Sequence, residues 1–111
     1  MLIALNHTLA LALEIALVIG VFRFGYGLSD HAVLKWVLAS ALTGCVVGLW
    51  AVLAAPKSRS RLDGAALAGF KAAMYAIGAG AVFVAFGPWP ALAFAALAAL
   101  HMALATSLGI L

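Results

Sequence analysis

Four long apolar stretches dominate this sequence and leave only short polar segments between them. They cover residues 2–24, 32–53, 65–86 and 91–110. Each stretch has about 20 to 23 residues, so as a helix it is about 30–35 Å long and matches the hydrocarbon core of a bilayer. Strands exposed to lipid would leave backbone groups without hydrogen bonds, so helices are expected. The sequence therefore predicts an all-α integral membrane protein with four transmembrane helices.

The composition excludes a soluble protein. Of the 111 residues, 68% are hydrophobic and 8% are charged, whereas soluble domains have roughly 45–50% apolar and 25% charged residues. Four spans occupy almost the whole chain, which leaves no length for a folded domain outside the membrane. We therefore expect a single transmembrane domain over residues 1–111 and no soluble enzyme.

The connections between the apolar stretches predict the topology. Because they are short, neighbouring helices should be antiparallel, which gives an up-down-up-down bundle. The second connection carries Lys57, Arg59 and Arg61, and by the positive-inside rule this connection and both termini face the cytoplasm. Binding of anionic lipid headgroups is a second interpretation of the same basic residues.

Two connections also suggest where helices begin. In the first, Ser29 or Asp30 is a suitable N-cap for the second helix, because a short oxygen-bearing side chain can accept a hydrogen bond from a free backbone N–H. The third connection, residues 87–90 with the sequence Gly-Pro-Trp-Pro, is expected to be a tight turn.

Polar side chains inside the apolar stretches are the candidates for function, because an ionisable group at bilayer depth costs about 2.5–3.5 kcal/mol or more and usually faces the bundle interior. His7 and Glu14 are seven residues apart and share a helix face. Lys71 and Tyr75 share a face of the third helix, and His101 lies near mid-depth in the fourth. We expect these five side chains to form a site that binds an ion or a solute, with Asn6 as a further polar position.

Glu14 has two interpretations from sequence. It is either a structural partner of Lys71, of His101 or of a backbone group, or a carboxylate that binds a proton or a cation. His101 is likewise either a hydrogen-bonded core histidine or a proton relay. We expect no metal site, because His7, His101 and Glu14 occupy at least two depths and His31 lies in the first connection. No catalytic, cofactor-binding or nucleic-acid-binding motif is present, so no enzyme, cofactor or nucleic-acid partner is expected.

Small residues at helical spacing indicate close helix contacts. Gly44 and Gly48 form a GxxxG pair, and alanine ridges follow in the third and fourth stretches. Such ridges let two backbones approach closely. They either pack the bundle internally or form the contact in a homodimer.

The chain resembles the YrdB-like family of small bacterial membrane proteins, a family of unknown function. The resemblance lies in these residues of the sequence: Leu5-Asn6, Leu13-Glu14, Trp36, Trp50, residues 54–57, Arg61-Leu62, Phe70, Tyr75 and Gly78. It implies four helices, no assigned reaction and a location in the bacterial cytoplasmic (inner) membrane.

Length, helix number and Glu14 in the first helix are also similar to the small multidrug resistance transporters, although the basic second connection is unlike theirs. On this analogy we expect a small transporter or channel that uses Glu14 and carries a proton or a small cationic solute. The alternative is a non-catalytic structural or accessory protein that binds partner helices. In either case the expected partners are the lipid bilayer and a second copy of the chain.

Overall fold

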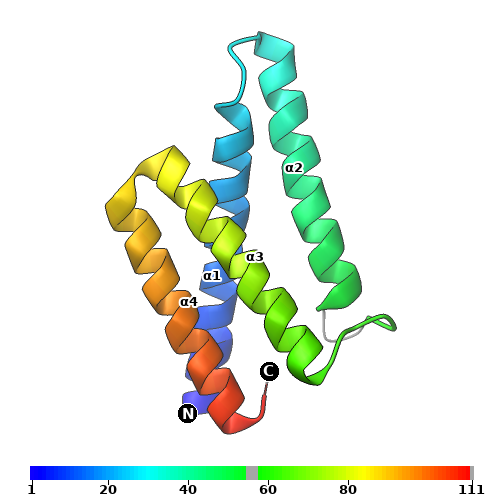
Figure 1. The fold of residues 1–111 in the computed structure, drawn as a ribbon, viewed down its shortest axis with the longest axis vertical. Coiled ribbons are helices and arrows are strands. Elements are labelled where there is room, and N and C mark those ends of the chain that lie inside the picture. The colour runs from blue at the N-terminus through cyan, green and yellow to red at the C-terminus, as the bar shows by residue number, and fades with distance from the viewer. Residues whose placement is uncertain (55–57, 111) are drawn as a thin grey trace.

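The structure is a computed structural model that describes residues 1–54 and 58–110 as an all-helical fold (Figure 1). Its helices are α1 (Leu2–Tyr26), α2 (Ala32–Leu53), α3 (Gly64–Phe86) and α4 (Pro88–Leu108). Each of the four is long and apolar enough to cross a membrane. The predicted fold class is therefore confirmed, and the described residues contain no strand.

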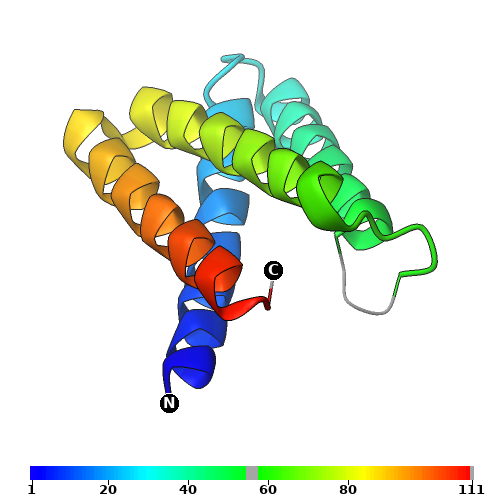
Figure 2. The same cartoon turned by 60° about the horizontal axis from the view of Figure 1, so that its bottom comes forward.

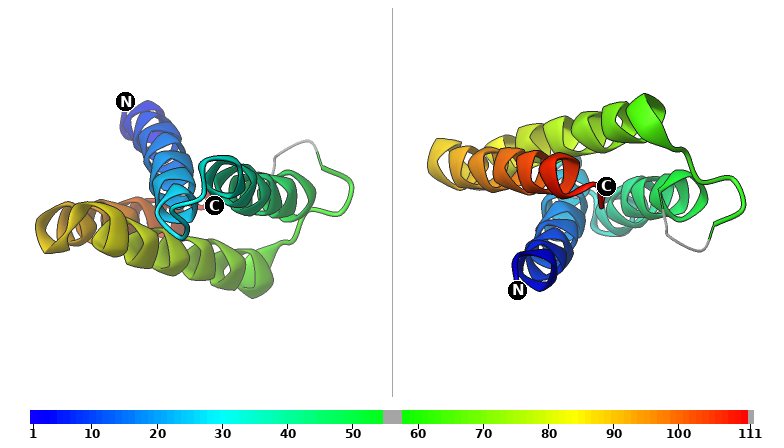
Figure 3. Two further views of the ribbon diagram at one scale, coloured as in Figure 1. Left: turned by 90° about the horizontal axis from the view of Figure 1, so that it is seen from above. Right: turned by 90° about the horizontal axis from the view of Figure 1, so that it is seen from below.

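Helix α1 organises the other three. It packs against α2, α3 and α4, and α3 packs against α4, whereas α2 barely meets α3. Successive helices run in alternating directions, and the start of α1 and the end of α4 lie at the end of the molecule where α2 finishes and α3 begins (Figure 2). Seen along the molecule, α3 and α4 form one layer that crosses α1 obliquely (Figure 3). Consequently α2 is held mainly by α1.

The buried core lies where α1 meets the α3–α4 layer. Its larger members are Leu13, Leu17 and Val21 of α1, Met74, Tyr75 and Val82 of α3, and Phe94 of α4. Many other large apolar side chains are exposed on all four helices. On a soluble protein so much exposed apolar surface would cause association, whereas in a bilayer it is the surface that contacts lipid.

The closest approach between α1 and α2 depends on Gly25. A Cβ atom at this position would lie 2.8 Å from the Cα atom of Ala39 and 3.0 Å from the carbonyl oxygen of Leu38. Both atoms belong to the α2 backbone, which cannot rotate away as a side chain could. Ala39 itself is fully buried. Glycine and alanine at this crossing therefore set the distance between the two helices.

The predicted N-cap of α2 is wrong by one or two residues. The cap is His31, whose Nδ1 accepts a hydrogen bond from the backbone N–H of Leu34 at 3.2 Å. Ser29 instead accepts from the backbone N–H of His31 at 3.1 Å and so orients the cap. The imidazole nitrogen takes the place of the usual Ser or Asp oxygen, because an unprotonated Nδ1 is also an acceptor.

Residues 88–90 are helical and are not the expected turn. The chain turns at Gly87, whose φ of 99° favours glycine, and α4 begins at Pro88. Proline is suited to the first turn of a helix because its missing N–H would have no partner there. Residues 55–57, which include Lys57 of the predicted topology signal, lie outside the described residues. The orientation in the membrane stays a prediction.

Replacing Gly25 by alanine should separate α1 from α2. We expect Gly25→Ala to lower the free energy of unfolding by about 1–3 kcal/mol, the usual cost of overpacking. Gly44→Ala is the matched control, because nothing lies within 4 Å of a Cβ atom there and alanine favours helix over glycine. Unfolding of both variants in mixed micelles measures the difference. Equal stability would contradict the close crossing.

Candidate functional site

A cavity of about 340 Å³ lies between the first half of α1, the ends of α2 and α4, and the first half of α3. We call it the polar cavity. Its polar lining residues are Asn6, His7, Glu14, Arg61, Lys71 and His101. Four of the five predicted site residues thus face one space, although they come from three helices. Their functional roles stay predictions.

The fifth predicted residue, Tyr75, does not line the polar cavity but packs against His101, which does. Its ring is buried and meets His101 edge-on, with ring centroids 5.8 Å apart and planes at 85°. On its other side Tyr75 meets Phe94, at 6.2 Å between centroids. Such edge-to-face contacts fix ring orientation. Tyr75 therefore positions the imidazole of His101 and does not itself line the polar cavity.

His101 and Asn6 are the most deeply buried polar pair, at 3% and 1% exposed. The Nδ1 atom of His101 lies 3.0 Å from Oδ1 of Asn6. Since an amide oxygen only accepts, Nδ1 is the donor in this bond. The other ring nitrogen, Nε2, is buried and has no hydrogen-bond partner. A buried polar atom without a partner is uncommon in native proteins.

Glu14 and Lys71 share the polar cavity without forming an ion pair. Both side chains are half-buried, and their opposite charges act on one another. Neither makes an ion pair or a hydrogen bond with another described residue. The structure therefore does not show the direct contact that a structural partnership between Glu14 and Lys71 requires. The carboxylate instead faces the cavity.

Two strongly basic side chains, Arg61 and Lys71, line the polar cavity. Arg61 extends from the segment before α3, where its Nε donates to the carbonyl oxygen of Ala54 at 3.1 Å. Its charge acts on Lys71, and the charges of Lys71 and His7 act on His101. Glu14 is the only carboxylate among the described lining residues. Lys71, which has no ion pair with a described residue, therefore attracts an anion brought into this space.

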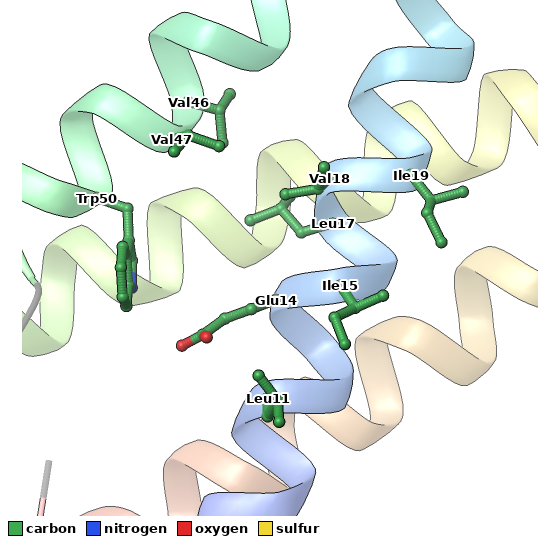
Figure 4. Close-up of a pocket in the computed structure, with 9 residues that line it drawn as sticks. All are labelled: Leu11, Glu14, Ile15, Leu17, Val18, Ile19, Val46, Val47 and Trp50. Carbon is green, nitrogen blue, oxygen red and sulfur yellow. The ribbon is translucent and has the colours of Figure 1, made fainter.

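A second hollow, of about 330 Å³, runs between α1 and α2 beside the polar cavity. We call it the apolar groove. Its aliphatic lining residues are Ile15, Leu17, Val18, Ile19, Val46 and Val47. Leu11, Glu14 and Trp50 line both hollows. Figure 4 shows the Glu14 side chain projecting from α1 toward Trp50 of α2. The two hollows therefore adjoin at Glu14 and Trp50.

Sequence reasoning missed the roles of three residues at this site. Arg61 was expected as a topology signal or a contact for lipid headgroups, and Trp50 was given no role in a site. Asn6 was noted as polar but given no partner, although it lies seven residues before Leu13 and so on the buried stripe of α1. That spacing could have placed Asn6 in the interior. The position of Arg61 depends on how the chain enters α3, which periodicity does not encode.

The GxxxG pair does not pack the bundle internally. Gly44 and Gly48 are exposed on α2, and a Cβ atom at either would have no neighbour within 4 Å. The reason is that α2 crosses α1 through Ala39 and leaves its glycine face outside. A contact with a second chain stays a prediction. In the described part of the chain, no group of three His, Cys, Asp or Glu residues could hold a metal ion.

Comparison with known proteins adds one match. The model of a family described as a protein of unknown function, DUF2568, matches residues 8–99. This agrees with the expected family of unknown function, while nothing tests the YrdB-like name. No curated protein and no solved structure matches the chain. The matched segment includes Glu14, Trp50, Arg61 and Lys71 of the polar cavity.

The hydrogen bond between Asn6 and His101 should be detectable as an energetic coupling. We expect Asn6→Leu to destabilise the fold by about 1–3 kcal/mol, because it leaves both nitrogens of a buried imidazole without partners. Adding His101→Phe should recover part of that loss, with a coupling of about 1 kcal/mol. A double-mutant cycle measures it. Thr8→Val is the control, since Thr8 bonds the carbonyl of Ala4 on an exposed face. Additive effects of Asn6→Leu and His101→Phe would contradict the pairing.

Proposed function

Because this chain belongs to the DUF2568 family, whose function is unknown, we propose its function from the geometry of the polar cavity. We propose that the protein is a small membrane transporter, without catalytic activity, that binds a proton at Glu14 and its solute in the polar cavity. The main support for the proposal is the position of Glu14. This residue lies at the middle of a helix long enough to span a membrane, and its carboxylate faces the polar cavity without a direct partner among the described residues.

The depth of Glu14 supports a role in transport. It lies twelve residues after Leu2 and twelve before Tyr26, at the middle of α1. An ionisable group at this depth costs several kcal/mol unless it is paired or hydrated. Since no described side chain pairs with it directly, hydration or protonation through the polar cavity has to offset this cost. A carboxylate in that setting exchanges its proton with water in the cavity.

The charged side chains of the polar cavity limit the kinds of solute that it could bind. A small cationic solute, as the analogy with multidrug transporters suggested, would be repelled by Lys71. The proton is the cation that remains, because it is carried covalently by Glu14. Both His7, which is exposed, and His101, which is buried, line the cavity, and we propose that they pass protons between its mouth and Glu14. We propose that this mouth faces the cytoplasm, as the positive-inside rule predicts from the basic residues before α3.

Helix α2 is the element that could open the site to the other side. Further along α1 than Glu14, the buried side chains of Leu17 and Val21 pack against α3 and α4 and fill the interior of the bundle. Because α2 barely meets α3, a change in its packing on α1 would break few contacts. Elements with few buried contacts open at low free-energy cost. We propose that movement of α2 exposes Glu14 alternately to the two sides.

Removing the carboxylate should abolish proton movement. In liposomes containing the protein and a pH-sensitive dye, we expect Glu14→Gln to reduce proton flux down an imposed pH gradient to the rate of empty liposomes. Asp30→Asn is the matched control, because Asp30 is exposed in the α1–α2 connection and its loss should leave flux unchanged. Wild-type flux in Glu14→Gln, or no flux in the wild type, would contradict the proposal.

Stability measurements on Glu14→Gln and Lys71→Met distinguish a structural role of Glu14 from a role in transport. A structural ion pair would make Glu14→Gln destabilising by about 3–5 kcal/mol, and Lys71→Met would restore much of the loss. For a transport carboxylate we expect Glu14→Gln to fold with nearly wild-type stability. Strong coupling between positions 14 and 71 would therefore count against the transport role.

Self-association is a second candidate function, favoured by the exposed glycine face of α2. Gly44 and Gly48 leave open space that a second helix could enter closely. We propose that two copies associate through this face. The alternative of an accessory protein that binds a foreign helix would use the same surface.

A leucine at the glycine face should weaken the dimer. We expect Gly48→Leu to raise the dissociation constant in lipid about fivefold, which corresponds to about 1 kcal/mol for a membrane helix contact. Gly69→Leu is the control, because Gly69 on α3 is equally open but lies on another helix. Energy transfer between labelled chains measures the constant. A wild type that is monomeric in lipid at every density would rule out self-association.

A further inference from the structure

We propose that the polar cavity and the apolar groove together hold one anionic amphiphile, with a phosphate-type headgroup in the polar cavity and a hydrocarbon chain in the apolar groove. This inference rests on the proposed function, because it names the class of solute that the transporter would carry. The observation behind it is that the two hollows, one cationic and one aliphatic, adjoin at Glu14 and Trp50.

The polar cavity has the donors that an anionic headgroup requires. Lys71 is half-buried and has no hydrogen bond or ion pair to another described residue. It lies seven residues after the start of α3, about 10 Å along the helix. An ammonium at this depth binds phosphate oxygens strongly, because charge-assisted hydrogen bonds are the stronger ones and little water competes. Arg61 adds positive charge beside it.

His101 provides an independent indication of an absent ligand. Its side chain is 3% exposed and lines the polar cavity, and its Nε2 has no partner. Nδ1 already donates to Asn6. Nε2 is therefore the unprotonated ring nitrogen, and its lone pair accepts a hydrogen bond. A hydroxyl group on the headgroup of the ligand would be the donor that this lone pair lacks.

The apolar groove explains why the ligand has a chain. Apart from Glu14 and the indole of Trp50, its lining is entirely aliphatic, and it lies between α1 and α2 (Figure 4). Because α2 barely meets α3, a lipid could enter from the side without crossing water. A free inorganic anion would fill only the polar cavity. Burying a hydrocarbon chain in the groove adds stabilisation in proportion to the apolar area covered.

Trp50 allows this inference to be tested directly, because it lines both hollows. With Trp36→Phe and Trp89→Phe, the fluorescence reports on position 50 alone. The protein is placed in phosphatidylcholine bilayers that contain small fractions of a lipid with a brominated chain, which quenches tryptophan on contact. We expect brominated phosphatidylglycerol to reach half-quenching at about fivefold lower mole fraction than brominated phosphatidylcholine, the preference that one basic side chain near the surface provides.

Variants of single side chains test which residue causes the preference for phosphatidylglycerol over phosphatidylcholine. We expect Lys71→Gln to remove the preference and Lys71→Arg to keep it. This pair of results would show that the site needs a positive charge at position 71 and stays folded when the side chain changes. Lys35→Gln is the matched control, because Lys35 lies over the Tyr26 ring at the other end of the bundle, 4.2 Å from its centroid. Val47→Phe, which fills the apolar groove, should reduce quenching by both lipids. A preference that persists in Lys71→Gln would overturn the inference.

Two other outcomes would also overturn the inference. Equal quenching by the two lipids in the parent protein would mean that no anionic headgroup is selected. Relief of quenching by excess inorganic phosphate would mean that a free anion is the ligand. Since binding is measured at equilibrium without a gradient, its failure differs from that of the transport proposal. Selective quenching without proton flux would support the ligand site and contradict the transport proposal. Proton flux without selective quenching would support transport and contradict the ligand site.

Discussion

The free-energy cost of polar side chains in hydrocarbon is the constraint on which this structure depends. The outer surface of the bundle is apolar, whereas Asn6 and His101 are buried against each other and Glu14 and Lys71 face a shared cavity. Helix α1 is central because one stripe of it carries both the apolar core residues and Asn6. The other helices pack around that stripe, so that the polar groups meet inside and not in lipid.

Much of the fold could be predicted from the sequence, because bilayer thickness fixes both the length and the composition of each span. The helix ends were less predictable, since they depend on local hydrogen bonds such as that of His31 to Leu34. Helical periodicity correctly placed His7 and Glu14 on one face. It could not show that Arg61 joins them or that the Gly44 face points outward, because both depend on how helices cross and on the path of the connection before α3.

The site combines two hollows of opposite character that share Glu14 and Trp50. A cationic cavity alone would be suited to a small anion, and an aliphatic groove alone would be a lipid contact. We propose that their junction at a carboxylate in the middle of α1 relates proton binding to the occupancy of both hollows, because a nearby charge changes how readily a carboxyl group ionises. The weak packing between α2 and α3 leaves this junction accessible from the side.

We propose that water reaches Glu14 through the polar cavity from the end where the chain termini lie. Thiol accessibility in a Cys45→Ser background, which removes the single native cysteine, tests whether water does so. Ala10 lines the polar cavity, whereas Ala12 of the same helix faces outward among apolar residues. We predict that Ala10→Cys reacts with a membrane-impermeant thiol reagent from the cytoplasmic side only, and that Ala12→Cys does not react from either side. An unreactive Ala10→Cys, or equal reactivity at both positions, would contradict a water-filled cavity at Glu14.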